Sequence, residues 1–252
     1  MLKILHLYPE LLNLYSDRGN ILTLEKRCSW RNIDLRVAKI GLNDPLNLEG
    51  ADLLLIGDGA KREQGIATKA LGKYRDELAR AIENGLVVLA IGSSFQMLGK
   101  YFPAVDGTKT RGLSIFDFYT VEGDKRLTGD AAIELSLDGE SNTSNSNIIV
   151  GFENHIGRTH LGKNSPLGRV LAGYGNNGLD NLEGMSYKNT FCTYLHGPLL
   201  PKNPELADSL ILLALQRKGV NIDKLPPLND DIEHRAKNAI INKLNSQSRT
   251  KK

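Results

Sequence analysis

Short apolar runs alternate with helical stretches through the first hundred residues, and this alternation limits the chain to a small set of folds. The runs cover residues 3–7, 34–40, 51–57 and 86–91. Apolar runs of this length, separated by helical segments, are typical of a parallel sheet that is covered by helices. The sequence therefore predicts an α/β fold with an open, mostly parallel sheet and flanking helices.

The segment between the third and fourth runs has the period of a helix. Apolar side chains recur at spacings of three and four, at Leu71, Tyr74, Leu78 and Ile82. The pair Asn84-Gly85 then supplies a helix stop signal. We expect one helix here, which forms a βαβ unit with the strands on either side.

The pattern changes beyond residue 105, where strand-like runs follow one another without long helices between them. They cover residues 115–122, 131–137, 148–152, 169–175 and 191–196. Such runs pair as hairpins, so we expect an antiparallel extension of the sheet. The very polar segment 138–147 is predicted to be an exposed loop without an assigned function.

Two helices are expected near the C-terminus. One begins at Asn203-Pro204, where an N-cap residue precedes a proline in the first turn, and ends at Gly219. The other is an amphipathic helix from about Asn229, whose basic end we interpret as a solvated terminus rather than a binding patch. We therefore divide the chain into one domain over residues 1–222 and a helical extension with a basic tail over residues 223–252.

Composition excludes several classes of protein. The chain is 40% hydrophobic and 24% charged with a net charge of +3, which indicates an ordinary globular protein and gives no sign of nucleic-acid binding. No run approaches the ~20 apolar residues of a membrane span, and the N-terminus lacks the pattern of a signal peptide. Cys28 and Cys192 are the two cysteines, too few for a disulfide framework or a zinc site. We expect a cytoplasmic protein.

Residues 86–99 carry the strongest functional signal. An apolar strand continues directly into Gly92-Ser93-Ser94 and then into a helical start. This is the layout of a nucleophile elbow, in which a sharp turn raises one side chain above the carboxyl edge of the sheet. A tight turn that uses glycine and serine for geometry alone fits the segment equally well.

The same segment also matches a family motif, Cys-Gly-Gly-aromatic-Gln-apolar-Leu-Gly, in its second half. Further blocks match the family in order, at residues 13–21, 62–64, 126–130, 151–155, 157–159, 173–177 and 193–198. Through these blocks, which extend from about residue 5 to 220, the chain resembles the glutamine amidotransferase subunits of lipid II isoglutaminyl synthase. These GatD-type subunits are relatives of the cobyric acid synthase amidotransferases.

The resemblance implies a class I glutamine amidotransferase domain, with a flavodoxin-like fold, over residues 1–222. It implies a subunit that takes ammonia from glutamine and delivers it to a Mur-ligase-like catalytic partner in a heterodimer. That partner would use ATP and Mg²⁺ to activate the α-carboxyl group of D-glutamate in the stem peptide of lipid II. No cofactor is expected in this chain itself.

The resemblance also assigns roles to individual residues. Gly92 stands where the family has its nucleophilic cysteine, and His196 matches the general base. Arg126 and Gln96 match residues that bind substrate. From the residues alone, His196 fits a structural histidine at a strand end, Arg126 a surface ion pair and Gln96 a hydrogen bond at a helix N-terminus.

Two further departures from the family pattern concern the surroundings of the reaction. Gly57, Asp58 and Gly59, together with Ser93, occupy the place of the oxyanion loop, where the family normally has a run of glycines. Asp58 would put a carboxylate where negative charge develops, if its side chain points inward. Pro198 stands where other class I enzymes have a glutamate that orients the histidine, and the resemblance implies that the partner subunit completes the triad.

Glycine at position 92 offers no nucleophile, so a thioester cannot form there. Ser93 could act after a shift of one residue, although a hydroxyl needs a well-oriented base. Cys192 lies four residues before His196, about 13 Å away on an extended strand, and is predicted to pack in the sheet. Cys28, four residues after Leu24 in a helix, is predicted to be a core residue.

Three hypotheses about function stay open at this point. The first is a GatD-type amidotransferase subunit that supplies ammonia. The second is a catalytically inactive pseudo-amidotransferase that binds and stabilises a Mur-ligase-like partner. The third is an amidotransferase of the cobyric-acid type.

Overall fold

A six-stranded sheet forms the centre of the computed structural model, which describes residues 1–135 and 147–249. Its strand order is β11-β12-β4-β3-β1-β2. Every neighbouring pair is parallel except β11 with β12. The predicted open, mostly parallel sheet is confirmed, with strands β1 (Leu2–Leu7), β2 (Leu35–Ile40), β3 (Leu53–Ile56), β4 (Val87–Ile91), β11 (Met185–Tyr187) and β12 (Thr190–Thr193).

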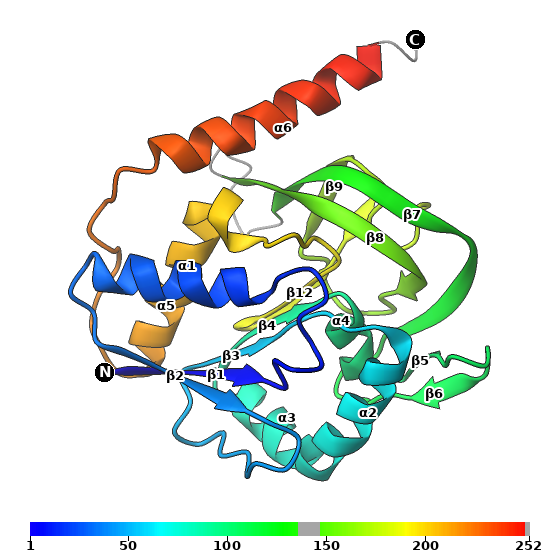
Figure 1. The fold of residues 1–252 in the computed structure, drawn as a ribbon, viewed down its shortest axis with the longest axis horizontal. Coiled ribbons are helices and arrows are strands. Elements are labelled where there is room, and N and C mark those ends of the chain that lie inside the picture. Colours follow the sequence, from blue (N-terminus) through cyan, green and yellow to red (C-terminus); the bar gives the residue numbers. More distant parts are fainter. Residues whose placement is uncertain (136–146, 250–252) are drawn as a thin grey trace.

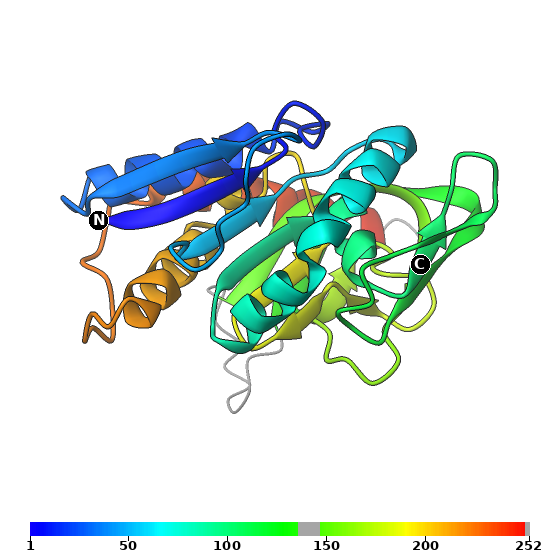
Figure 2. The ribbon, with the colours of Figure 1, turned by 90° about the horizontal axis from the view of Figure 1, so that it is seen from below.

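Helices cover both faces of this sheet (Figures 1 and 2). Every residue of β3 and β4 is buried, which is why these strands are continuous apolar runs in the sequence. Alternate side chains enter two separate cores. One core contains α2 (Lys61–Leu71) and α3 (Arg75–Glu83), and the other contains α1 (Arg18–Ser29) and α5 (Pro204–Arg217).

The prediction of one helix over residues 71–82 is wrong. Helix α2 ends at Leu71, a 3₁₀ turn η1 (Gly72–Tyr74) follows, and α3 begins at Arg75. Glycine weakens a helix interior, and the tighter turn changes the direction of the chain at this point. Leu71, Leu78 and Ile82 nevertheless enter the same core, so the apolar period survives the break.

The strand-rich part of the chain forms a second sheet, of order β10-β9-β7-β8, in which all pairs are antiparallel. The runs 115–122 and 131–137 do not form two strands, because their described residues from Tyr119 onward belong to one long strand with a register shift between Glu122 and Leu127. The strands are β7 (Tyr119–Leu135), β8 (Ile148–His160), β9 (Gly168–Ala172) and β10 (Leu182–Glu183), and a separate hairpin contains β5 (Tyr101–Pro103) and β6 (Lys109–Arg111).

Placing the run 191–196 in the antiparallel part is also wrong. Its strand, β12, joins the central sheet parallel to β4, with Thr193 opposite Ile91. A short apolar run does not specify which strand it pairs with, and here the tertiary fold decides. The consequence is that the chain after β12 leaves the sheet beside the end of β4.

Helix α5 begins at Pro204 as predicted, but Asn203 does not cap it through its side chain. The Asn203 amide instead accepts from Val150 N at 2.9 Å and donates to Val150 O at 2.8 Å and Leu199 O at 2.7 Å. The two bonds to Val150 satisfy backbone groups of β8, the edge strand of the second sheet. Asn203 therefore ties α5 to the second sheet.

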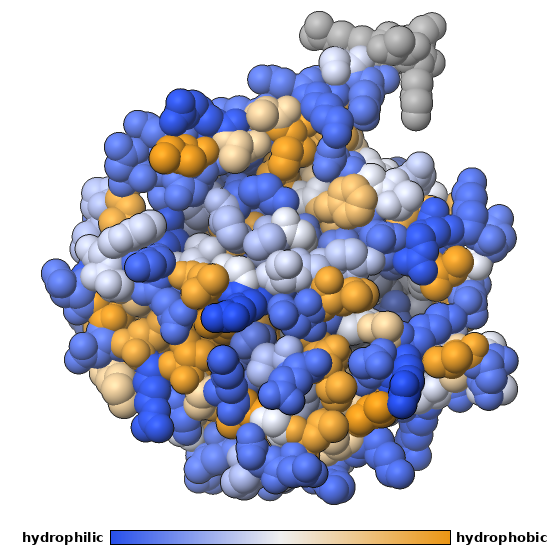
Figure 3. Space-filling view, viewed as in Figure 1, coloured by the Kyte–Doolittle hydropathy of each residue, from blue (hydrophilic) through white to orange (hydrophobic). Residues whose placement is uncertain are grey.

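The predicted C-terminal helix is present as α6 (Asp231–Arg249), which lies across the second sheet (Figure 1). Lys237, which is 2% exposed, pairs with Glu205 of α5 at 3.2 Å, and Lys243 pairs with Asp130 of β7 at 2.6 Å. Figure 3 shows hydrophilic side chains along α6 with apolar ones between them. The basic tip 250–252 and loop residues 138–146 lie outside the described residues, and the boundary at 222/223 stays a prediction.

The helices that the structure describes include none that is long and apolar enough to cross a membrane.

Glu183 connects the two sheets. It belongs to β10 of the second sheet, and its carboxylate accepts from Thr193 Oγ1 at 3.0 Å and from Tyr194 N at 2.7 Å, at the end of β12. Burial raises the pKa of Glu183 to about 8. The side chain therefore holds the segment that leads to His196 through hydrogen bonds that it accepts, while burial favours its protonated form.

We predict that Glu183→Gln flattens the dependence of stability on pH. Because the folded-state pKa exceeds the ordinary value, the contribution of Glu183 is complete below about pH 4.5 and is lost as pH rises through about 8. Glutamine keeps an acceptor for Tyr194 N and cannot ionise. Between pH 5 and 8.5 the natural chain should lose about 1 kcal/mol or more of unfolding free energy relative to the variant.

Urea denaturation at several pH values measures this difference. Glu49→Gln, at an exposed glutamate, is the matched control and should follow the natural chain. Parallel stability curves for the natural chain and Glu183→Gln would contradict the role given to Glu183.

Candidate active site

Strand β4 passes into α4 (Ser93–Leu98) through a sharp turn at Gly92, whose φ is 61° and ψ is −119°. The Gly92 N–H donates to Thr193 O at 2.8 Å, which joins the turn to β12. Side chains with a Cβ rarely adopt this backbone conformation, so the position favours glycine. The predicted strand-to-helix turn is therefore present at residues 92–94.

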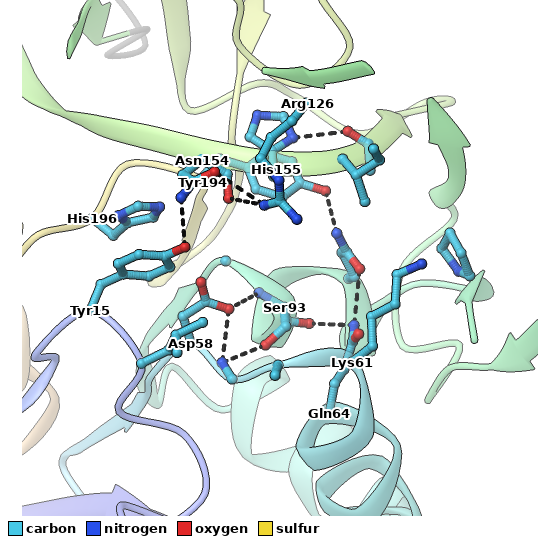
Figure 4. Close-up of a pocket in the computed structure, with 18 residues that line it drawn as sticks. Tyr15, Asp58, Lys61, Gln64, Ser93, Arg126, Asn154, His155, Tyr194 and His196 are labelled. Atoms are coloured by element: carbon cyan, nitrogen blue, oxygen red, sulfur yellow. Dashed lines mark hydrogen bonds between the residues drawn. The ribbon is translucent and has the colours of Figure 1, made fainter. Parts of the chain in front are cut away.

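The loop after β3 lies against this turn, and its Asp58 side chain points inward (Figure 4). Asp58 Oδ1 accepts from Ser93 N at 2.7 Å and from Gly59 N at 2.8 Å. The Gly59 N–H also reaches Ser93 Oγ, at 2.9 Å. The carboxylate thus occupies backbone donors of the kind that stabilise an oxyanion in acyl transfer.

Asp58 also fills the space into which a side chain at position 92 would extend. A Cβ added to Gly92 would lie 2.3 Å from Asp58 Cγ and 2.5 Å from each carboxylate oxygen. Asp58 is 7% exposed, and burial raises the pKa of its carboxyl despite the hydrogen bonds from Ser93 and Gly59. The departures at positions 58 and 92 are therefore in direct contact.

Asp17, at the start of α1, fixes the backbone of this loop. Its Oδ2 accepts from Asp58 N at 2.7 Å, and its Oδ1 accepts from Asn20 Nδ2 at 3.2 Å. The side chain is fully buried, and burial raises the pKa of Asp17 to about 7. Asp17 was not among the predicted site residues, although it lies in the matched block 13–21.

His196 follows β12 and lies flat against Tyr15, with ring centroids 3.9 Å apart and planes 7° from parallel. Its Nδ1 is buried and has no hydrogen-bond partner among residues 1–135 and 147–249, so no carboxylate in that part of the chain orients the ring. Burial lowers the pKa of His196 to about 4. The imidazole is neutral at pH 7 and can accept a proton.

Gln96 belongs to a chain of side-chain hydrogen bonds. Gln64 Nε2 donates to Gln96 Oε1 at 3.0 Å, and Gln96 Nε2 donates to Tyr194 Oη at 3.0 Å. Gln64 Nε2 also donates to Ser93 O at 3.0 Å. The network links α2 and α4 to Tyr194, the residue after β12, at one wall of the site, and Gln96 does not act as a backbone cap at the helix N-terminus.

Arg126, on β7, is held by hydrogen bonds and forms no ion pair within the described part of the chain, contrary to the alternative interpretation. Its guanidinium donates to Asn154 Oδ1 at 3.1 Å and to Asn154 O at 3.2 Å. Asn154 Nδ2 in turn donates to Tyr15 Oη at 2.8 Å. Arg126 therefore presents a cationic group at the cavity, and Asn154 holds it in place.

These residues surround a cavity of about 210 Å³. Of the predicted site residues, only Gly57 does not line it, because its carbonyl is turned to the hydroxyl of Ser94. The volume suits a ligand of amino-acid size and is smaller than a drug-sized site. The structure thus brings together Gly92, His196, Arg126, Gln96, Asp58, Gly59 and Ser93.

Several residues that line the cavity were not predicted from the sequence. His155 stacks on Tyr194 with ring centroids 3.8 Å apart, and its Nδ1 lies 2.9 Å from Gly157 O. Among the missed residues with polar side chains, all but one fall in matched blocks, so the blocks themselves contained the signal. These polar residues are Tyr15, Lys61, Gln64, Asn154, His155 and Tyr194, of which only Lys61 lies outside a block.

The alternative nucleophiles differ in position. Cys28 and Cys192 are buried away from the cavity, and burial raises the pKa of both thiols, that of Cys28 to about 11. Neither is a thiolate at neutral pH. Ser93 lines the cavity, but its Oγ is bonded to Gly59 N, and the described residues show no hydrogen bond from it to His196.

Comparisons with known proteins give a consistent result. The family model of the CobB/CobQ-like glutamine amidotransferase domain matches residues 3–204. The GatD subunit of the glutamine-hydrolyzing lipid II isoglutaminyl synthase of Staphylococcus aureus N315 is 43% identical over 250 residues, which cover 99% of each chain. The corresponding subunit of Streptococcus pneumoniae R6 is 36% identical over 91% of this chain and 86% of its own.

Among solved structures, PurLQS from Thermotoga maritima matches with a TM-score of 0.56 over 85% of this chain and 98% of that one. At 17% identity this likeness concerns the fold alone. The family model and the two relatives go further, since they cover most or all of the sequence. The chain therefore belongs to the CobB/CobQ-like glutamine amidotransferases and, among them, to the GatD-type subunits.

Proposed function

We propose that this chain is the glutamine amidotransferase-type subunit of a heteromeric lipid II isoglutaminyl synthase. The observation that carries the proposal is the 43% identity to a GatD subunit over 99% of both chains. Similarity over the full length favours this role over that of a cobyric-acid-type amidotransferase.

In this role the subunit supplies ammonia from glutamine to a Mur-ligase-like partner. The partner uses ATP and Mg²⁺ to activate the α-carboxyl group of D-glutamate in the stem peptide, and ammonia then displaces the activating group. A reaction that consumes ATP belongs in the cytoplasm, where we place the complex.

The site retains several parts that hydrolysis of a carboxamide requires. A nucleophile must attack the carboxamide carbon while a base accepts its proton, and His196 is a neutral imidazole at the cavity. Arg126 offers a cation to a substrate carboxylate, and Gln96 contributes an amide to the wall. Since Gly92 has no side chain, the attacking group must be the Ser93 hydroxyl or water.

A second candidate function has a specific observation in its favour. The Asp58 carboxylate accepts from Ser93 N and Gly59 N, and it abuts Gly92, where a nucleophile would stand. This arrangement favours a pseudo-amidotransferase, which binds and stabilises the Mur-ligase-like partner without hydrolysing glutamine. The ligase would then use free ammonia or another donor.

Both candidates predict a stoichiometric complex with a Mur-ligase-like protein. Affinity purification of the tagged full-length chain from its native cell, followed by size exclusion and mass spectrometry, measures this directly. His196→Ala lies inside the cavity and should recover the partner to the same extent. Purification of the natural chain alone would contradict the proposal.

The nitrogen donor separates the two candidates. If the subunit supplies ammonia, the complex amidates lipid II with glutamine, and His196→Ala lowers that rate by about 100-fold or more because the base is lost. Ser93→Ala should lower it as well if the hydroxyl is the attacking group. Product is measured by mass spectrometry of the stem peptide.

If the subunit is a pseudo-amidotransferase, amidation occurs with ammonium chloride but not with glutamine, and His196→Ala changes neither result. A complex that amidates lipid II with neither donor would contradict both candidates.

A further inference from the structure

Asp58 occupies the site as a bound acyl group would. In acyl transfer, the carbonyl oxygen of the substrate accepts hydrogen bonds from backbone N–H groups beside the nucleophile. Here one carboxylate oxygen of Asp58 accepts from Ser93 N and Gly59 N, while the other is directed away from them, as Figure 4 shows. The chain thus satisfies these donors with its own side chain.

A hydrogen bond and close packing hold the backbone at Asp58 in place. Asp17 accepts from the Asp58 backbone N–H at 2.7 Å. The preceding Gly57 packs so closely that an added Cβ would lie 2.2 Å from Leu12 O. Its backbone is therefore held, and its side chain, which lines the cavity, is 7% exposed.

Steric exclusion connects Asp58 to Gly92. Carbon atoms that are not bonded approach to about 3.5 Å at their optimum, whereas a Cβ at position 92 would lie 2.3 Å from Asp58 Cγ. A side chain at 92 and the inward carboxylate of Asp58 therefore cannot coexist without movement. Glycine at 92 therefore leaves room for the inward carboxylate of Asp58, in addition to suiting the backbone turn.

We propose that Asp58 determines the specificity of this cavity, because its carboxylate replaces the acyl oxygen of a substrate and excludes the carboxamide of glutamine from the turn at Gly92. The inference rests on the family membership that underlies the proposed function, and it favours the pseudo-amidotransferase candidate. It also implies that restoring a cysteine at 92 is insufficient while Asp58 is present.

Glutamine binding tests the exclusion of the carboxamide. Titration calorimetry should show at least about tenfold tighter binding of L-glutamine to Asp58→Gly than to the natural chain, since the two N–H donors become available. Asp58→Asn is the matched control, because it removes the charge and keeps the bulk, and it should resemble the natural chain. Equal affinity of the natural chain and Asp58→Gly would overturn the proposal, as would a gain in Asp58→Asn equal to that in Asp58→Gly.

Reaction with an electrophile tests the contact between positions 58 and 92. The probe is a glutamine-like amino acid that carries a chloroketone in place of the carboxamide, and a thiolate displaces its chloride to form a thioether. Intact mass spectrometry should show at least about tenfold faster addition of one label to Asp58→Gly/Gly92→Cys than to Gly92→Cys or Asp58→Asn/Gly92→Cys. The natural chain, whose two cysteines are buried, should stay unlabelled.

Labelling of Gly92→Cys at the rate of the double variant with glycine at 58 would overturn the proposal. The change in melting temperature caused by Gly92→Ala is a second test. An equal change in the natural background and in the Asp58→Gly background would overturn the proposal independently. These experiments use the isolated full-length chain, whereas the proposed function is tested by recovery of the partner. Failure of one is therefore distinguishable from failure of the other.

Discussion

The two hydrogen bonds from Ser93 N and Gly59 N to the Asp58 carboxylate are the interaction on which the rest of the site depends. Backbone N–H donors that face a cavity beside a nucleophile normally stabilise the negative charge that develops on the substrate oxygen during the reaction. Here the carboxyl group of Asp58 accepts from both donors, and leaving a buried donor without a partner would be costly. The same carboxylate fills the space beside Gly92, so the two departures from the family pattern are in direct contact.

The fold explains why the site keeps its shape despite this change. In a parallel sheet the carboxyl ends of neighbouring strands meet at one edge. Strands β3, β4 and β12 are adjacent, and they deliver the Asp58 loop, the turn at Gly92 and the segment with His196 to that edge. Glu183 and Asn203 then attach the second sheet, which contributes Arg126 and Asn154. None of these supports requires a nucleophile at position 92.

Much of the fold could be predicted from the sequence because β3 and β4 are buried on both faces and leave continuous apolar runs. The pairing of β12 could not be predicted, because a short apolar run does not specify which strand it pairs with. The polar stretch 123–126 likewise concealed that β7 is one strand. At the site, Asp58 and Gly92 were each recognised as departures. Their contact depends on the sheet, which brings together residues that are 34 positions apart.

The most direct measurement is a crystal structure of the natural full-length chain grown with excess L-glutamine. The account predicts density for the Asp58 carboxylate within hydrogen-bonding distance of Ser93 N and Gly59 N, and no carboxamide at those donors. Density for a glutamine carboxamide oxygen on the two N–H groups, with Asp58 turned out of the cavity, would contradict it.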